Sequence, residues 1–112
     1  MVSFEGIEMA VVTFQEKDVT AGVPVAMDSD GTVKNAGSGA ALVGLALNVR
    51  GGCAAVQVKG YAQLPYTGTA PALGWSRLTA DGSGGVTAAS SGGREYLVVQ
   101  VDSDNKTVGL FL

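Results

Sequence analysis

Apolar and polar residues alternate along the stretch 42–65, on both sides of the pair Gly51-Gly52. Period-two alternation is typical of a β-strand with one buried face, and a glycine pair suits the central positions of a tight hairpin turn, where φ is positive. The pattern therefore predicts a long antiparallel hairpin around which the rest of the chain is organised. A wider loop of the same parity gives the same buried face. A two-residue turn gives these facing pairs: Arg50 with Cys53, Val49 with Ala54, Leu47 with Val56, and Leu45 with Val58.

A second hairpin is predicted at the end of the chain, where residues 95–101 and 107–112 alternate on either side of the polar turn 102–106. Shorter strand-like runs lie at 9–14, 23–27, 32–35, 75–80 and 86–88. Runs at intervals of about ten residues, with glycine turns between them and no helical window, indicate an all-β fold. We expect a small single-domain β-sandwich or barrel of short antiparallel strands and glycine-rich turns.

The domain organisation follows from the same pattern. No internal repeat is visible and no linker is long enough to divide the chain, so we expect a single β domain over residues 9–112. Residues 1–8 show neither the periodicity of a strand nor that of a helix, and they are interpreted as an N-terminal arm. The segment 66–71 begins after one proline and ends on another, and it is predicted to be a surface loop. The predicted core consists of apolar residues from the two hairpins: Leu45, Leu47, Val56, Val58, Leu97, Val99, Val108 and Leu110.

The residue types that are missing limit the chemistry of this chain. It has 112 residues, a net charge of -3, one cysteine and no histidine. A chain of this length can bury a core without a disulfide or a metal. Without histidine, neither a Ser-His-Asp triad nor a Cys-His metal site is possible, and the glycine-rich runs lack the Gly-Lys-Ser/Thr ending of a phosphate loop. We therefore expect no enzymatic activity, no catalytic residues and no cofactor, and the scattered Lys and Arg residues disfavour nucleic-acid binding.

Two acidic pairs, Asp28 with Asp30 and Asp102 with Asp104, are candidates for a calcium site. An EF-hand is excluded, because the position that needs a glutamate holds Gly39 after the first pair and lies past the end of the chain after the second. Aspartate beside serine, glycine and asparagine is above all a turn composition. We therefore expect no metal, although a weak cation site at either pair stays open.

The sequence shows no membrane-spanning or export segment. No apolar run approaches the ~18 residues that a spanning helix needs, and the first residues lack a basic signal region. We expect a soluble protein, without membrane attachment, that is made in the cytoplasm.

The aromatic residues are candidates for a contact surface. Tyr61 and Phe111 fall on the parity opposite to the predicted core, Tyr66 lies in the predicted loop, and Trp75 begins a predicted strand. Apolar groups on a second face need a second partner, which is the other sheet in a sandwich or another subunit in an oligomer. Both interpretations stay open, and Trp75 also suits the core. We take these four residues as candidates for a subunit interface.

Five landmarks follow one another in the region 19–112. They are Gly22-Val23-Pro24-Val25, Gly44-Leu45-Ala46-Leu47, Val56-Gln57-Val58 followed by Gly60 and Leu64-Pro65, Leu73-Gly74, and Gly85-Val86. In their order and spacing, the chain resembles the small capsid decoration (cement) proteins of tailed bacteriophages and prophages. The resemblance implies a non-catalytic protein that is made in the bacterial host and binds the exterior of the virion. It also implies a homotrimer that clamps neighbouring copies of the major capsid protein together.

On this interpretation, residues 1–8 form a capsid-docking arm whose contact residues are Val2, Phe4 and Ile7. The alternative is that the arm packs on its own domain or on a neighbouring subunit. A different class of function also stays open. It is a small-molecule-binding β-barrel module, or an accessory domain of a larger enzyme, in which glycine loops surround a ligand.

Overall fold

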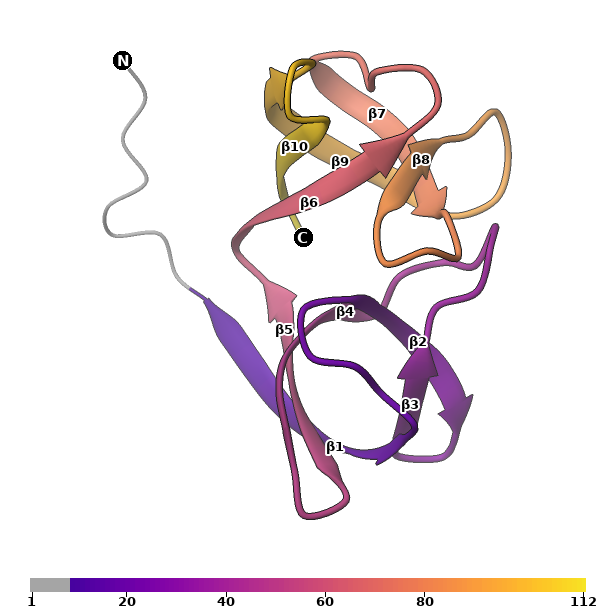
Figure 1. Ribbon diagram of the computed structural model, residues 1–112, viewed down its shortest axis with the longest axis vertical. Helices are drawn as coiled ribbons and strands as arrows, with labels where there is room; N and C mark the ends of the chain where they lie inside the picture. The colour runs from indigo at the N-terminus through magenta and orange to yellow at the C-terminus, as the bar shows by residue number, and fades with distance from the viewer. Residues whose placement is uncertain (1–8) are drawn as a thin grey trace.

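The computed structural model describes residues 9–112, which form ten β-strands and no helix (Figure 1). The predicted all-β fold is confirmed. The predicted arm, with Val2, Phe4 and Ile7, lies outside the described residues. The strands are β1 (Ala10–Lys17), β2 (Pro24–Ser29), β3 (Thr32–Asn35), β4 (Gly44–Arg50), β5 (Cys53–Lys59), β6 (Tyr61–Thr67), β7 (Gly74–Ala80), β8 (Val86–Ala88), β9 (Arg94–Asp102) and β10 (Thr107–Phe111).

These strands form two closed five-stranded barrels, the first below the second in Figure 1. The strand order is β1-β3-β2-β4-β5 in the first barrel and β10-β6-β8-β7-β9 in the second. In each barrel the first strand along the chain runs parallel to the third, and every other pairing is antiparallel. The two halves of the chain therefore have the same connectivity, although no repeat is visible in the sequence. The two parallel pairs correct the expectation of antiparallel strands alone.

The turn of the predicted central hairpin is confirmed. Gly51 and Gly52 have φ angles of 59° and 79°, as a two-residue primed turn requires. Arg50 faces Cys53 across the base of the turn, as predicted.

Beyond this turn, a β-bulge at Leu47 shifts the register of β4 against β5. Asn48 faces Ala55, but Ala46 rather than Leu47 faces Val56. A shift of one residue moves the following side chains to the other face of the sheet. As a result Ala46 is buried, whereas the Leu47 side chain is 43% exposed. The prediction that Leu47 belongs to the core is therefore wrong.

The closing hairpin contains a bulge of the same kind at Val99. Gln100 faces Gly109, but Val98 rather than Val99 faces Leu110. Val98 is consequently buried, and Val99 is only half-buried. The outcome for the other predicted core residues is mixed: Val56, Val108 and Leu110 are buried, while Leu45, Val58 and Leu97 are half-buried.

The chain passes from the first barrel to the second at Gly60. This residue separates β5 from β6 and has a φ of 112°, which glycine adopts without steric cost. Its carbonyl accepts a hydrogen bond from the amide of Leu112 at 2.9 Å. After this break, β6 continues through Pro65 and Tyr66. The prediction of a loop beginning at residue 66 is therefore wrong at its start.

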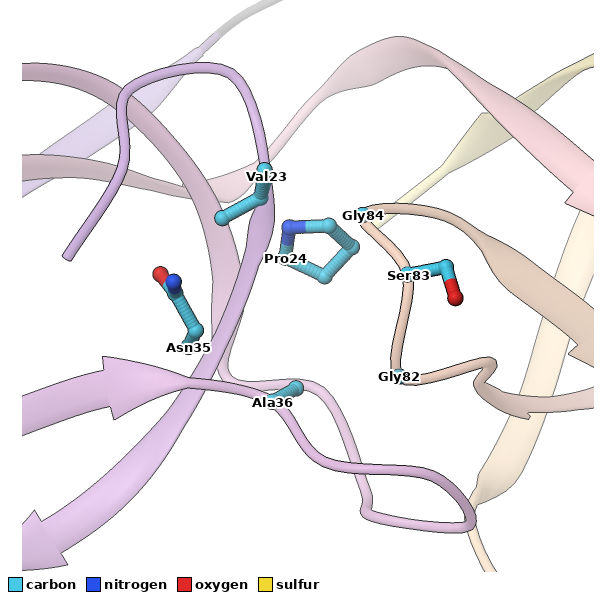
Figure 2. A pocket seen from close by; sticks show the side chains of 7 residues that line it. All are labelled: Val23, Pro24, Asn35, Ala36, Gly82, Ser83 and Gly84. Carbon is cyan, nitrogen blue, oxygen red and sulfur yellow. The ribbon is translucent and has the colours of Figure 1, made fainter.

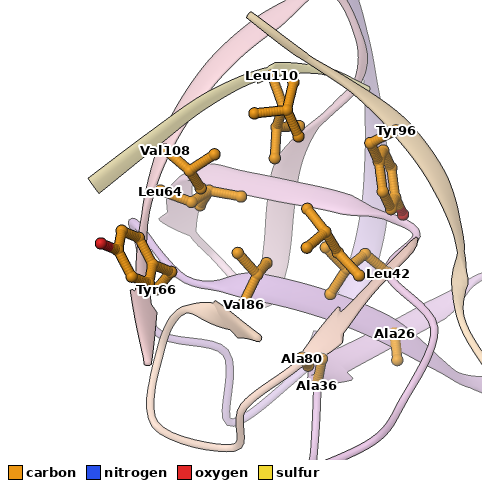
Figure 3. Packing of buried hydrophobic residues seen from close by; sticks show 12 residues of the cluster. Ala26, Ala36, Leu42, Leu64, Tyr66, Ala80, Val86, Tyr96, Val108 and Leu110 are labelled. Atoms are coloured by element: carbon orange, nitrogen blue, oxygen red, sulfur yellow. The ribbon is translucent and has the colours of Figure 1, made fainter. Parts of the chain in front are cut away.

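Two clusters of buried side chains form the core. One cluster fills the second barrel and also includes Ala26, Ala36 and Leu42 from the first half of the chain (Figure 3). The amide of Ala80 donates a hydrogen bond to the carbonyl of Ala40 at 3.0 Å, which joins the two halves in the same region. The barrels therefore share part of their core. The other cluster lies in the first barrel and consists of Val19, Val25, Val33, Ala46, Ala54 and Val56.

Candidate functional site

Within the described residues, one edge of the N-terminal half of β1 is unpaired. β1 pairs with β5 along residues 10–15, but it pairs with β3 only at residues 15–17. Within residues 9–112, no strand pairs with the other edge of residues 10–14. The main-chain groups of such an edge are available for pairing with a strand of another molecule.

The same half-strand exposes apolar side chains on both of its faces. Val11 and Val12 are 47% and 42% exposed, and Met9 just before them is exposed as well. Successive side chains of a strand point to opposite faces, so Val11 and Val12 lie on opposite sides of the sheet. Exposed apolar groups that gather in this way mark interaction surfaces more often than chance. We call residues 9–14 the exposed β1 segment.

The exposed β1 segment follows directly after the predicted arm in the sequence. Val2, Phe4 and Ile7 lie outside the described residues, but the chain that carries them continues into Met9 and β1. Sequence reasoning missed Val11 and Val12, because the run 9–14 predicts a short strand but does not show that one of its edges is unpaired. The indication was present, since apolar residues occupy both parities of this run and no single buried face explains them.

The four aromatic interface candidates do not lie together on one surface. Tyr66 is only 3% exposed and belongs to the core of the second barrel, so its assignment to an interface is corrected. Tyr61 and Phe111 face each other on neighbouring strands. Their rings meet edge to face, with centroids 5.8 Å apart. This pair is half-buried within the single chain.

Trp75 is the candidate that the structure leaves most accessible. Its side chain is 69% exposed at the start of β7, so the alternative of a core position is wrong. Leu73, two residues earlier in the loop before β7, is 68% exposed and was missed by the sequence analysis. These two neighbouring, exposed side chains are a stronger candidate for a contact between subunits than the half-buried Tyr61–Phe111 pair.

Asp28 and Asp102, one from each acidic pair, make side-chain contacts. Asp28 lies 3.8 Å from the Lys34 ammonium group. The Asp102 carboxylate accepts hydrogen bonds from the amide groups of Asp104 and Asn105 and from the Asn105 side chain. The bonds from Asn105, led by the side-chain bond, lower the pKa of Asp102. Among residues 9–112, no three histidine, cysteine, aspartate or glutamate side chains gather into a possible metal site.

A small hollow lies where the two barrels meet (Figure 2). Its volume is about 200 Å³, and it is lined by residues 23–24 where β2 begins, residues 35–36 where β3 ends, and the loop 82–84. The side-chain carbonyl oxygen of Asn35 already accepts a hydrogen bond from the amide of Thr20 at 3.0 Å. No titratable side chain lines this hollow, so its chemistry is that of a packing gap between the barrels.

The comparisons with known proteins assign no family to this chain. No protein-family model matches the chain, and no curated protein is similar enough to count as a relative. In the part of the chain that the structure describes, no helix is long and apolar enough to cross a membrane.

Proposed function

We propose that this protein is a non-catalytic structural protein that binds the outer surface of a phage capsid and stabilises the shell. The exposed β1 segment carries the proposal, because it combines an edge that no strand of residues 9–112 pairs with and apolar side chains on both faces. The resemblance of the five sequence landmarks, in order and spacing, to those of capsid decoration proteins supports the same function. On this proposal the partner is the major capsid protein, and the site of action is the virion exterior after synthesis in the bacterial host cytoplasm.

Strand addition is the mode of attachment that suits the exposed β1 segment. An added strand of the capsid protein forms main-chain hydrogen bonds along the free edge, which supply affinity without requiring particular side chains. Val11 and Val12 then enter contacts on opposite faces of the extended sheet, and these contacts supply selectivity. The arm, with Val2, Phe4 and Ile7, extends the same interaction beyond Met9.

Repetition strengthens such an attachment. A strand that adds a few residues binds weakly alone, but several linked contacts on one shell raise the net affinity by mass action. A homotrimer supplies three linked contacts. In this proposal the exposed pair Leu73 and Trp75 provides the apolar contact between subunits.

The alternative of a small-molecule-binding barrel has less support. Side chains such as Val56 and Leu110 fill the interiors of the two barrels. The hollow between the barrels measures about 200 Å³, which is below the range of roughly 300–1,000 Å³ that is common for ligand pockets. In residues 9–112, side chains thus fill both barrel interiors, and the hollow between the barrels is smaller than a usual ligand pocket.

The proposal is tested by sedimenting the protein with expanded capsids of the phage that encodes it. We expect the wild-type chain to sediment with the capsids, and the double variant Val11→Asp/Val12→Asp to stay in the supernatant with its melting temperature little changed. Thr13→Asp is the matched control, because Thr13 is exposed on the same strand and is already polar. It should reduce binding far less than the double variant. Binding of the double variant at the wild-type level contradicts docking through β1.

Deletion of residues 1–8 separates the two interpretations of the arm. If the arm docks on the capsid, the shortened chain keeps its melting temperature and oligomeric state but loses capsid binding. A lower melting temperature or a dissociated oligomer shows instead that the arm packs on its own domain or on a neighbouring subunit.

A further inference from the structure

The outer face of the second barrel carries a groove that plays no part in the proposed docking. Its volume is about 370 Å³, which falls in the range of ligand pockets. It lies across the neighbouring strands β6, β10 and β9 and the turn that joins the last two. Its lining is Gln63, Gln100, Asp102, Asn105, Thr107 and Gly109.

The floor of the groove is Gly109, which has a glutamine on either side. Gly109 faces Gln63 on β6 and Gln100 on β9. Directly paired residues of an antiparallel sheet project to the same face, so both amides stand beside the glycine. A Cβ atom at position 109 would overlap the hydroxyl group of Tyr61. The missing side chain is therefore what lets Tyr61 reach across β10.

The Tyr61 hydroxyl makes a long hydrogen bond to each of the two amides. Its oxygen accepts a hydrogen bond from Nε2 of Gln63 at 3.3 Å, and the hydroxyl donates to Oε1 of Gln100 at 3.4 Å. Gln63 thus keeps its carbonyl oxygen for an incoming group, and Gln100 keeps its NH₂ group. The groove presents one acceptor and one donor at matching positions on either side of Gly109.

The Asp102 carboxylate provides a second, stronger acceptor at one end of the groove. Its Oδ1 atom accepts from the amides of Asp104 and Asn105 at 3.0 and 3.1 Å, and its Oδ2 atom accepts from Nδ2 of Asn105 at 2.8 Å. These bonds hold the carboxylate in one orientation. A carboxylate oxygen has about two acceptor positions, so Oδ2 has room for one further donor, and a bond to a charged acceptor is stronger than a neutral one.

The chemistry of this lining selects one class of ligand. No lysine or arginine lines the groove, which disfavours phosphate, carboxylate and nucleic acids, and a single carboxylate is too few for a divalent cation. Amides, a hydroxyl and one carboxylate instead match a molecule whose groups both donate and accept hydrogen bonds. We propose that this groove binds a neutral carbohydrate, whose hydroxyl groups bond to Gln63, Gln100 and Asp102.

The equivalent position of the first barrel lacks these groups and provides a control. Gln100 directly follows the bulge residue of β9, just as Asn48 directly follows the bulge residue of β4. Asn48 faces Ala55, which in turn faces Thr13. The first barrel therefore has the same backbone frame with an alanine at the floor, and this triad lines neither the groove nor the hollow described above.

The test is an NMR titration of the full chain with neutral trisaccharides of glucose, galactose, mannose and N-acetylglucosamine at millimolar concentration. We expect at least one sugar to shift the backbone amide resonances of residues 61–63 and 100–109. Gln100→Ala and Gln63→Ala should each weaken that binding by about tenfold, the loss expected for a hydrogen-bonding group. Asn48→Ala, the matched change in the first barrel, should not weaken it.

Three outcomes overturn the proposal: no shift with any of these sugars, shifts confined to other parts of the chain, or unchanged binding by both glutamine variants. Both glutamines are exposed on the surface, so folding is checked separately from the melting temperature of each variant. Because the groove and the exposed β1 segment share no residue, capsid sedimentation of Gln100→Ala should equal that of the wild-type chain.

Discussion

Leu47 and Val99 occupy the same place in the two barrels. Each is the extra residue of a β-bulge in the fourth strand of its barrel, opposite the fifth strand. The bulge turns the preceding residue, Ala46 or Val98, into the core. Connectivity and bulge position therefore repeat together, although the side chains do not.

The bulge at Leu47 predicts that this residue contributes little to stability. Its side chain is 43% exposed, whereas Leu110 is fully buried. Leu110→Ala should lower the free energy of unfolding by about 2–5 kcal/mol, and Leu47→Ala by about 1 kcal/mol or less. Urea unfolding of both variants measures the difference. Equal losses would contradict the observed register.

Replacement of Gly44 is predicted to be destabilising for steric reasons. A Cβ atom at this position would overlap the main-chain carbonyl of Gln57 and the side chain of Val56, and a main-chain group cannot rotate away. Gly44→Ala should therefore lower the free energy of unfolding by about 1–3 kcal/mol. Gly37→Ala is the control, because nothing lies within 4 Å of a Cβ atom there. A neutral Gly44→Ala variant would show that β4 and β5 are not packed this closely.

The hydrogen bonds to Asp102 predict a pH dependence. The pKa of Asp102 is lowered from its ordinary value of 3.8, so these bonds stabilise the folded chain above that pH, and this contribution is lost as the pH falls through the lower, folded-state pKa. Asn105→Ala removes the side-chain bond and should raise the pKa of Asp102 towards its ordinary value. Ser103→Ala, in the same turn, should leave it unchanged. NMR titration of the Asp102 carboxyl carbon measures both, and an equal pKa in the two variants contradicts the assignment.

The core shared by the barrels predicts one cooperative unfolding transition. Leu42 belongs to the first half of the chain but packs in the cluster of the second barrel (Figure 3). Leu42→Ala should therefore lower the protection of amide protons in both barrels against hydrogen exchange, by a similar factor. Loss of protection in one barrel alone would show that the halves unfold independently.

Trp75 predicts a fluorescence signal for assembly. It is the single tryptophan of the chain and is largely exposed, so the free subunit should emit at long wavelength and be quenched readily by acrylamide. Contact with another subunit should shift the emission to shorter wavelength. Trp75→Ser should leave the melting temperature of the subunit unchanged, whereas Tyr66→Ser should cost about 3 kcal/mol or more, because Tyr66 is buried. An emission spectrum that does not change on assembly contradicts the interface role of Trp75.

Local chemistry explains which parts of the fold could be predicted from the sequence. Gly51-Gly52 specifies its turn, and the bounds of β3 and β8 agree with the predicted runs, since alternation and glycine turns act over a few residues. The bulges could not be predicted, because the bulge residues Leu47 and Val99 are apolar, like Ala46 and Val98, which take the buried positions. Barrel closure and the parallel pairs depend on contacts between distant strands, which no local pattern encodes.

The candidate sites show the same limit. Asp102 was singled out as one of an acidic pair, but Gln63, Gln100 and Gly109 are ordinary residues until the sheet places them side by side. Tyr66 was assigned to a loop because prolines lie near it, yet β6 continues past Pro65 with the Tyr66 amide bonded to the carbonyl of Lys106 at 3.0 Å. A proline is compatible with a strand where its missing donor leaves no partner unsatisfied.

The repeated connectivity gives this small chain two copies of one strand arrangement. A change on the outer face of one barrel leaves its counterpart in the other untouched, so the two surfaces can be altered independently while the strand order is kept. Thr13, Ala55 and Asn48 on one side, and Gln63, Gly109 and Gln100 on the other, already differ at every place. For protein engineering, Thr13, Ala55 and Asn48 are thus positions at which a second recognition surface can be built without redesigning the fold.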